Sequence, residues 1–197
     1  SSDLGSTSKV YDGTSAALLS GANFSLSGFV AGEGASITKT AGSFANGNVG
    51  TGKTVSVSLA SGDYTASGST LLANYVLPTA VSGAIGTISP KALTVTGLSA
   101  ANKVYDGTTA ASLSGGTLAG VVGSDAVTLT GLTGSFASKD AGSAIAVTVT
   151  GASLSGAAAG NYTVANPTGL SADITARALA IAATAFAAPR RFGASAE

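Results

Sequence analysis

The stretch Lys9-Val10-Tyr11-Asp12-Gly13-Thr14 returns as Lys103-Val104-Tyr105-Asp106-Gly107-Thr108, an offset of 103 − 9 = 94 residues. Further strings follow both copies in the same order: Gly-Ser-Phe-Ala at 42–45 and 134–137, Asn-Tyr at 74–75 and 161–162, and Ile88–Leu93, which returns as Ile174–Leu179. The last offset is 174 − 88 = 86 residues, so the second copy has lost about eight residues from its loops. A period of about 90 residues is too long for a solenoid coil and fits an independently folding domain. The chain is therefore predicted to hold two tandem domains.

The hydrophobic pattern within each copy has a period of two, which is typical of half-buried β-strands. Residues 54–59 read Thr-Val-Ser-Val-Ser-Leu, and residues 144–150 read Ala-Ile-Ala-Val-Thr-Val-Thr. Clusters of Gly, Ser, Asn and Asp interrupt such segments about every eight to twelve residues, as expected for a sandwich of short strands. The predicted fold is all-β, with two tandem Ig-like β-sandwich domains at residues 1–90 and 91–176.

The two ends of the chain differ from the middle. In the second copy a predicted strand begins at Lys91, whereas the first copy has only the polar residues 1–8 at this point. The first strand of the first copy is therefore expected to be weak or missing. Residues 177–197 are predicted to be a strand-forming tail that begins a further repeat or donates a strand to another molecule. The residues predicted to take part in strand exchange are Ala178, Leu179, Ala180 and Ile181.

The composition argues against most catalytic and nucleic-acid-binding chemistry. Histidine and cysteine are absent, which removes the commonest general base, the thiolate nucleophile and most transition-metal ligands. Nine basic and nine acidic residues cancel, and they form no basic stripe for nucleic acid. The longest apolar run, Ala178–Ala188, is shorter than the roughly 20 residues that a membrane-spanning helix needs. We therefore expect no enzymatic activity, no cofactor, no metal site, no nucleic-acid partner and no membrane span.

The string from Lys103 to Ala111, together with Gly160–Thr163 and Ile174–Leu179, resembles the YDG and MBG ("mostly bacterial Ig-like") repeats. These repeats occur in large secreted adhesins of the filamentous-haemagglutinin type. The resemblance covers both copies, roughly residues 9–180. It implies an Ig-like β-sandwich in a bacterial surface protein outside the cell, and it brings no catalytic residues.

The repeated motifs have a structural interpretation. Asp followed by Gly is a turn signal, because Asp bonds the backbone ahead of it and Gly accepts a positive φ. The tyrosine before it is expected to cover a sheet end while its hydroxyl finds a backbone partner. The asparagine of each Asn-Tyr pair is expected to serve a turn or corner. The motif residues are Tyr11, Asp12, Gly13, Tyr105, Asp106, Gly107, Asn74, Tyr75, Asn161 and Tyr162.

Three functions are open. The first is a spacer, in which tandem domains hold a binding tip away from the cell. The second is a self-assembling extracellular filament, in which the C-terminal strand pairs with the open sheet edge near residues 1–8 of the next molecule. The third is binding of host or biofilm glycans through Tyr11, Tyr105 or Phe29. The expected partners are accordingly neighbouring repeats, identical subunits or glycans.

Overall fold

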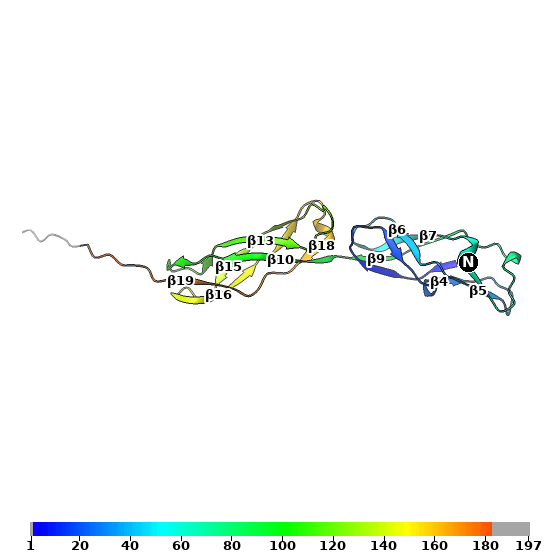
Figure 1. The fold of residues 1–197 in the computed structure, drawn as a ribbon, viewed down its shortest axis with the longest axis horizontal. Helices are drawn as coiled ribbons and strands as arrows, with labels where there is room; N and C mark the ends of the chain where they lie inside the picture. Colours follow the sequence, from blue (N-terminus) through cyan, green and yellow to red (C-terminus); the bar gives the residue numbers. More distant parts are fainter. Residues whose placement is uncertain (1, 183–197) are drawn as a thin grey trace, which may run out of the picture.

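The computed structural model describes residues 2–182. Within that range the chain consists of β-strands, four short 3₁₀ segments and connecting turns, without an α-helix. The 3₁₀ segments span Gly21–Asn23, Ser61–Asp63, Leu72–Asn74 and Ala159–Asn161. None of the described helices is long and apolar enough to cross a membrane. The two copies lie end to end and form an elongated molecule (Figure 1).

The strands of the first copy are β1 (Ser2–Leu4), β2 (Thr7–Val10), β3 (Ala16–Leu18), β4 (Phe24–Leu26), β5 (Gly34–Ile37), β6 (Ala41–Phe44), β7 (Gly50–Ser58), β8 (Tyr64–Ser67) and β9 (Ala80–Ser89). Five of them form a sheet with the order β2-β9-β7-β6-β3. Its neighbours are antiparallel except β2 and β9, which run parallel. Two smaller sheets, β1-β4 and β5-β8, complete the copy.

The strands of the second copy are β10 (Lys91–Ala100), β11 (Lys103–Val104), β12 (Ala110–Ala111), β13 (Leu113–Ala119), β14 (Thr128–Thr130), β15 (Thr133–Phe136), β16 (Gly142–Thr150), β17 (Ser153–Ser155), β18 (Tyr162–Val164) and β19 (Leu170–Thr175). The five-stranded sheet returns as β11-β19-β16-β15-β12, again with one parallel pair at its edge. The all-β prediction and the tandem duplication are thus confirmed, and the duplication extends to the order of the strands.

The copies differ where each one begins. β10 has ten residues and lies between β13, which is antiparallel to it, and β18, which is parallel to it. Its counterpart β1 has three residues and pairs only with β4. The opening strand of the first copy is therefore present in the described residues as β1. The residues of β10 that contact β18, Lys91–Leu93, have no counterpart among the described residues of the first copy.

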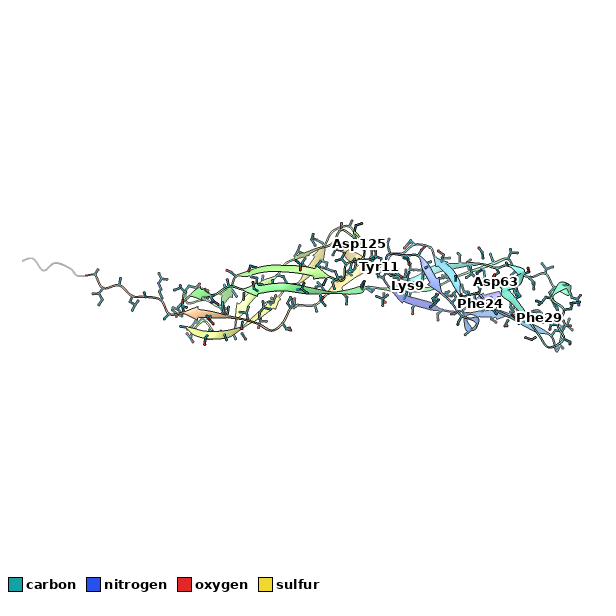
Figure 2. The ribbon with its side chains drawn as sticks, in the orientation of Figure 1. Lys9, Tyr11, Phe24, Phe29, Asp63 and Asp125 are labelled. Carbon is teal, nitrogen blue, oxygen red and sulfur yellow. The ribbon has the colours of Figure 1, made fainter. Side chains whose placement is uncertain are left out.

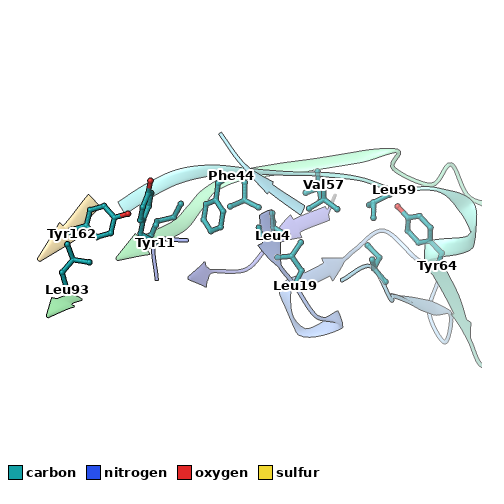
Figure 3. Packing of buried hydrophobic residues seen from close by; sticks show 14 residues of the cluster. Leu4, Tyr11, Leu19, Phe44, Val57, Leu59, Tyr64, Leu93 and Tyr162 are labelled. Carbon is teal, nitrogen blue, oxygen red and sulfur yellow. The ribbon is translucent and has the colours of Figure 1, made fainter. Parts of the chain in front are cut away.

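Apolar and polar residues alternate along the strands, and the apolar residues form the core. Val55 and Val57 of β7 are buried, and the serines between and after them are exposed. Burying each such side chain stabilises the fold by about 1.5–3 kcal/mol. The buried cluster runs the length of the first copy and continues through Tyr11 to Leu93 and Tyr162 of the second copy (Figure 3). The hydrophobic core of the first copy is therefore continuous with the contact between the copies.

A single residue separates the last strand of the first copy from the first strand of the second. β9 ends at Ser89 and β10 begins at Lys91, with Pro90 between them. Proline fixes its own φ and favours an extended conformation in the residue before it. The connection is therefore short and stiff.

The strand predicted at Ala178–Ile181 is absent from the described part of the tail. Residues 176–182 contain no strand, and the side chains of Leu179 and Ile181 are 94% and 99% exposed. The physical reason is that a strand needs a neighbour for its backbone hydrogen bonds, and no described segment pairs with these residues. The rest of the predicted tail, residues 183–197, lies outside the described residues.

Candidate functional site at the junction of the two copies

The Tyr-Asp-Gly motif of the first copy forms a cross-linked turn. Asp12 accepts hydrogen bonds from the backbone N–H of Thr14 at 2.8 Å and from the ammonium group of Lys9 at 2.7 Å. Gly13 has a φ of +79°, in the region that glycine tolerates best. The Lys9 ammonium also donates to the carbonyl oxygen of Thr14 at 2.7 Å and lies 5.6 Å from the centre of the Phe44 ring. The turn residues thus hold each other in place, as turn chemistry predicts.

The second copy builds the same turn with the same partners. Asp106 accepts from Lys103 and from the N–H of Thr108, each at 2.9 Å, and Gly107 again has a φ of +79°. The hydrogen bond from Lys103 holds the pKa of Asp106 at about 2, and Lys9 holds the pKa of Asp12 at about 2 in the first copy. Both carboxylates are therefore ionised, and their role is to fix the turn that follows each tyrosine.

The turn of the first copy presents Tyr11 to the second copy. The side chain of Tyr11 is only 6% exposed, and its hydroxyl donates to a carboxylate oxygen of Asp125 at 2.8 Å. The expectation of a backbone partner for this hydroxyl is therefore wrong. The partner is a charged group on the neighbouring domain, which forms a stronger hydrogen bond than a backbone carbonyl would.

Tyr162 completes this contact from the second copy. Its hydroxyl donates to the same oxygen of Asp125 at 2.6 Å and accepts a hydrogen bond from the N–H of Val122 at 2.9 Å. The rings of Tyr11 and Tyr162 meet edge to face, with centroids 5.3 Å apart and an interplanar angle of 77°. Such aromatic pairs add about 0.5–1.5 kcal/mol beyond their burial. Figure 3 shows the two rings side by side above Leu93.

The shared carboxylate shifts the pKa of all three groups. Hydrogen bonds from Tyr162 and Tyr11 lower the pKa of Asp125 below its ordinary value. The hydrogen bond to Asp125, helped by burial, raises the pKa of Tyr11 to about 12. Burial, followed by the bond to Asp125, raises the pKa of Tyr162. Each shift favours the protonation states in which both phenols donate to an ionised carboxylate.

A second set of contacts flanks the tyrosines. The side-chain oxygen of Asn161 accepts a hydrogen bond from the N–H of Val49 at 2.9 Å, and its amide nitrogen donates to the side-chain oxygen of Asn48 at 3.3 Å. A Cβ atom on Gly13 would lie 3.0 Å from a methyl carbon of Val122. The asparagine expected to serve a turn thus bonds across the junction, and the glycine of the motif is also needed for close packing.

Only some of the predicted motif residues meet. Tyr11, Gly13, Asn161 and Tyr162 come together at the junction, where Figure 2 labels Tyr11 and Asp125. The counterparts lie at the two free ends. Tyr105, Asp106 and Gly107 follow β11 at the far end of the second copy, and Asn74 and Tyr75 lie at the far end of the first copy.

Sequence reasoning missed Asp125, the acceptor at the centre of the junction. A signal was present, because the loop that starts at Gly120 carries its acid at the same position as Glu33 in the loop that starts at Gly28. A single aspartate in a glycine-rich loop is common. The correspondence between Asp125 and Glu33 therefore indicates a functional role only when the positions of Tyr11 and Tyr162 are known.

The burial of Tyr11 also bears on glycan binding, since its ring offers no open face for a sugar. Phe29, in contrast, packs against Tyr75 at 4.8 Å between centroids and lines a cleft of about 140 Å³ at the free end of the first copy. Among the described residues, no group of three or more acidic residues is placed to hold a metal ion. The junction is therefore a packed contact whose polar groups bond one another.

Comparison with known families gives one match. The sequence model described as "YDG domain" matches residues 1–82 and again residues 89–169. Comparisons with curated proteins and with solved structures give no match.

Proposed function

This chain belongs to the YDG domain family, in two tandem copies, and we propose that it is a structural stalk module of a secreted bacterial cell-surface adhesin. In this proposal each copy is an Ig-like β-sandwich, the module works outside the cell, and it catalyses no reaction. Its task is to hold neighbouring repeats at a fixed spacing and direction.

The observation that carries the proposal is the bridge from Tyr11 to Asp125 and Tyr162. Domains in one chain move relative to each other by default unless their interface is extensive and well packed. Here the two copies are separated by Pro90 alone, and a buried aromatic pair with a shared carboxylate joins them. These contacts oppose bending at the point where a two-domain chain would otherwise be flexible, which is the property a stalk needs.

The exposed surface is consistent with this role. Only 9% of the residues are charged, and the exposed positions of β7 and β16 are largely serine, threonine and alanine. Short, uncharged side chains give few strong attachment points for other macromolecules. Such a surface keeps a spacer from adhering along its length.

The proposal is tested by the shape of the molecule in solution. We expect small-angle X-ray scattering to show a single elongated shape at concentrations where the chain is monomeric. A variant carrying Tyr11→Phe and Asp125→Ala is expected to give a broader distribution of end-to-end distances. The matched control carries Tyr105→Phe and Glu33→Ala, which change the corresponding residues at the free ends and should leave the shape unaltered. A native chain as flexible as the junction variant would contradict a stalk function.

A self-assembling filament is the second candidate function. The observation that favours it is the exposure of Leu179 and Ile181, large apolar side chains in a segment without a neighbour among the described residues. Near residues 1–8, the proposed acceptor, β2 is the edge strand of the sheet β2-β9-β7-β6-β3, and β1 pairs only with β4. Among the described strands, each of the two therefore pairs on one side only.

A further inference from the structure

The loop between β6 and β7 holds the single Asn-Gly dipeptide of the sequence, Asn46-Gly47. The backbone nitrogen that follows an asparagine can attack the side-chain amide carbon and close a five-membered succinimide ring. Glycine permits this attack best, because it has no side chain to crowd the approach and its backbone is the freest. Every other asparagine precedes a larger residue or a proline. These following residues are Phe24, Val49, Tyr75, Lys103, Tyr162 and Pro167.

The folded loop activates the side-chain amide of Asn46. Its Oδ1 accepts hydrogen bonds from the ammonium group of Lys53 at 2.7 Å and from the backbone N–H of Asn48 at 3.1 Å. Attack at Cγ moves negative charge onto this oxygen, and donors already aimed at an oxygen that gains charge lower the barrier of such a step. Asn46 is also exposed, so water reaches it. The loop therefore favours ring closure at this residue.

The two Asp-Gly turns are protected from the same reaction. A carboxyl group closes the ring only when it is protonated, because water is a far better leaving group than oxide. The pKa values of Asp12 and Asp106, both about 2, keep these groups ionised near neutral pH. Ring closure in this chain is therefore expected at the asparagine and not at the turns.

The second copy builds the corresponding loop without an amide. Ser138 stands in the position of Asn46, and its hydroxyl accepts a hydrogen bond from the N–H of Asp140 at 3.1 Å. Asn46 accepts from the N–H of Asn48 at the same distance. The hydrogen-bonded loop thus forms with either side chain, which makes serine a suitable replacement for the asparagine.

The loop of Asn46 lies against the junction of the two copies. The N–H of Val49 donates to the side-chain oxygen of Asn161 at 2.9 Å, and the side-chain oxygen of Asn48 accepts from Asn161 at 3.3 Å. On its other side the loop touches the Tyr-Asp-Gly turn, since a Cβ on Gly47 would lie 2.9 Å from the carbonyl oxygen of Thr14. A change in the length of the backbone here would displace contacts between the copies.

We propose that Asn46 is a self-catalysed deamidation site whose reaction loosens the junction as the protein ages. The Gly47 nitrogen bonds to Cγ of Asn46, the bond from Cγ to the amide nitrogen breaks, and the proton lost by Gly47 leaves, through water, with the ammonia. One water molecule then opens the ring. Opening at the side-chain carbonyl gives aspartate, and opening at the backbone carbonyl gives isoaspartate, without any oxidant or reductant.

The two products differ in their effect on the junction. Isoaspartate carries its Cβ in the main chain, so the backbone before Gly47 becomes longer and Asn48 and Val49 move relative to Asn161. Aspartate leaves the backbone unchanged and places a carboxylate beside the Lys53 ammonium, where it forms a surface ion pair. The loosening is therefore specific to isoaspartate. The proposal does not rest on the stalk function, because it concerns the chemistry of one loop and its contacts with Asn161.

The first test measures the rate of deamidation during incubation of the native chain at mildly alkaline pH and body temperature. Mass spectrometry follows the change of amide to acid, and enzymatic methylation detects isoaspartate. We expect Lys53→Met to slow the reaction about threefold or more, because one donor to the developing oxyanion is lost. Lys53→Arg, which keeps a donor, should stay near the native rate. Lys139→Met, which removes the same charge from the corresponding loop of the second copy, should leave the rate unchanged.

A synthetic peptide of residues 43–49 gives the rate without the fold, and the native chain is expected to react at least as fast. A native rate below that of the peptide, or a rate that Lys53→Met leaves unaltered, would overturn the proposed activation by the loop.

The second test measures the effect of the reaction on the junction. Ion-exchange chromatography separates the isoaspartate form of aged protein, and circular dichroism checks that it is folded. Its Val49 amide should exchange hydrogen faster than in fresh protein, because the bond to Asn161 is lost. Asn46→Ser incubated in the same way and the product mimic Asn46→Asp should both retain the native exchange rate. An isoaspartate form with native exchange at Val49 would refute the coupling, whatever the shape of the whole molecule.

Discussion

Tyr11 shows how one residue acts differently in two copies of one motif. Its counterpart Tyr105 has the same turn behind it, yet only Tyr11 lies against another domain and donates to a carboxylate there. The sequence predicts the turn, because Asp-Gly and its lysine are local features. It does not predict the partner Asp125, because that contact joins residues 114 positions apart and depends on how two domains meet.

Substitutions of the glycines in the two turns can distinguish the effect of the junction contact from the effect of backbone strain. Gly13 and Gly107 share a φ of +79°, so replacement by alanine strains both turns by about 1 kcal/mol. Only Gly13 has a neighbour across the junction, the Val122 methyl group, whereas a Cβ at Gly107 would meet nothing within 4 Å. We expect Gly13→Ala to loosen the coupling of the copies in scattering measurements and Gly107→Ala to lower stability without doing so. Equal effects on coupling would show that Gly13 acts only through its turn.

The raised pKa of Tyr11 predicts a loss of coupling at alkaline pH. A separated Tyr11 would ionise near its ordinary value of 10.0, whereas Tyr11 at the junction has a pKa of about 12. The neutral phenol of Tyr11 stabilises the contact between the two copies. This stabilisation is therefore fully present below pH 10 and is lost as the pH rises toward 12. Ultraviolet titration should show a delayed tyrosine that is absent in Tyr11→Phe, and the end-to-end distance should become variable over the same pH range. A titration curve unchanged by Tyr11→Phe would contradict this assignment.

At the scale of elements, the predictable strands are those with a strict period of two. β7 and β16 follow directly from the alternation at residues 54–59 and 144–150, since each buries one face. The parallel pairing of β2 with β9 cannot be predicted from the sequence of either strand, because it joins segments from opposite ends of a copy. The strand predicted in the tail stays a prediction, for a related reason. Residues 178–181 have a strand-like sequence, but pattern alone cannot supply the neighbour that a strand requires.

Substitutions of Leu93 and Leu179 can test whether a strand residue contributes to stability only when a neighbouring strand packs against it. Both occupy the third position of the repeated segments that begin at Lys91 and Arg177, but Leu93 is buried and Leu179 is exposed. Leu93→Ala is expected to lower the free energy of unfolding by about 2–5 kcal/mol through loss of packing in the core. Leu179→Ala in the monomer should change it by less than about 0.5 kcal/mol. Chemical denaturation monitored by circular dichroism measures both, and a small loss for Leu93→Ala would show that the junction is loosely packed.

At the scale of the whole molecule, the two copies share a topology but not a core. The buried cluster of the first copy extends into the junction, whereas that of the second copy away from the junction consists of Phe136, Val147, Ala172 and Ile174. The composition of the strands does not indicate this difference, because alanine and glycine occupy the same number of strand positions in the two copies. The second copy therefore gains more of its stability from contact with a neighbour.

Hydrogen exchange measures this asymmetry in the intact chain. Backbone amides of β16 and β15 are expected to exchange faster than those of β7 and β6, because fewer buried contacts oppose local opening. Amides of β10 near Leu93 should be the best protected in the second copy, since they lie next to the junction. Uniform protection across the two five-stranded sheets would show that the smaller cluster does not limit stability.

The parallel edge pair of the first copy has a mechanical consequence. β2 lies near the start of the copy and β9 at its end, and Thr7–Val10 are aligned in the same direction as Gly86–Ser89. Tension applied along the molecule pulls these two strands in opposite directions along their length. Their hydrogen bonds are then loaded in shear, all together, and must break at once rather than in succession. Such an arrangement resists extension far better than a hairpin pulled open from one end.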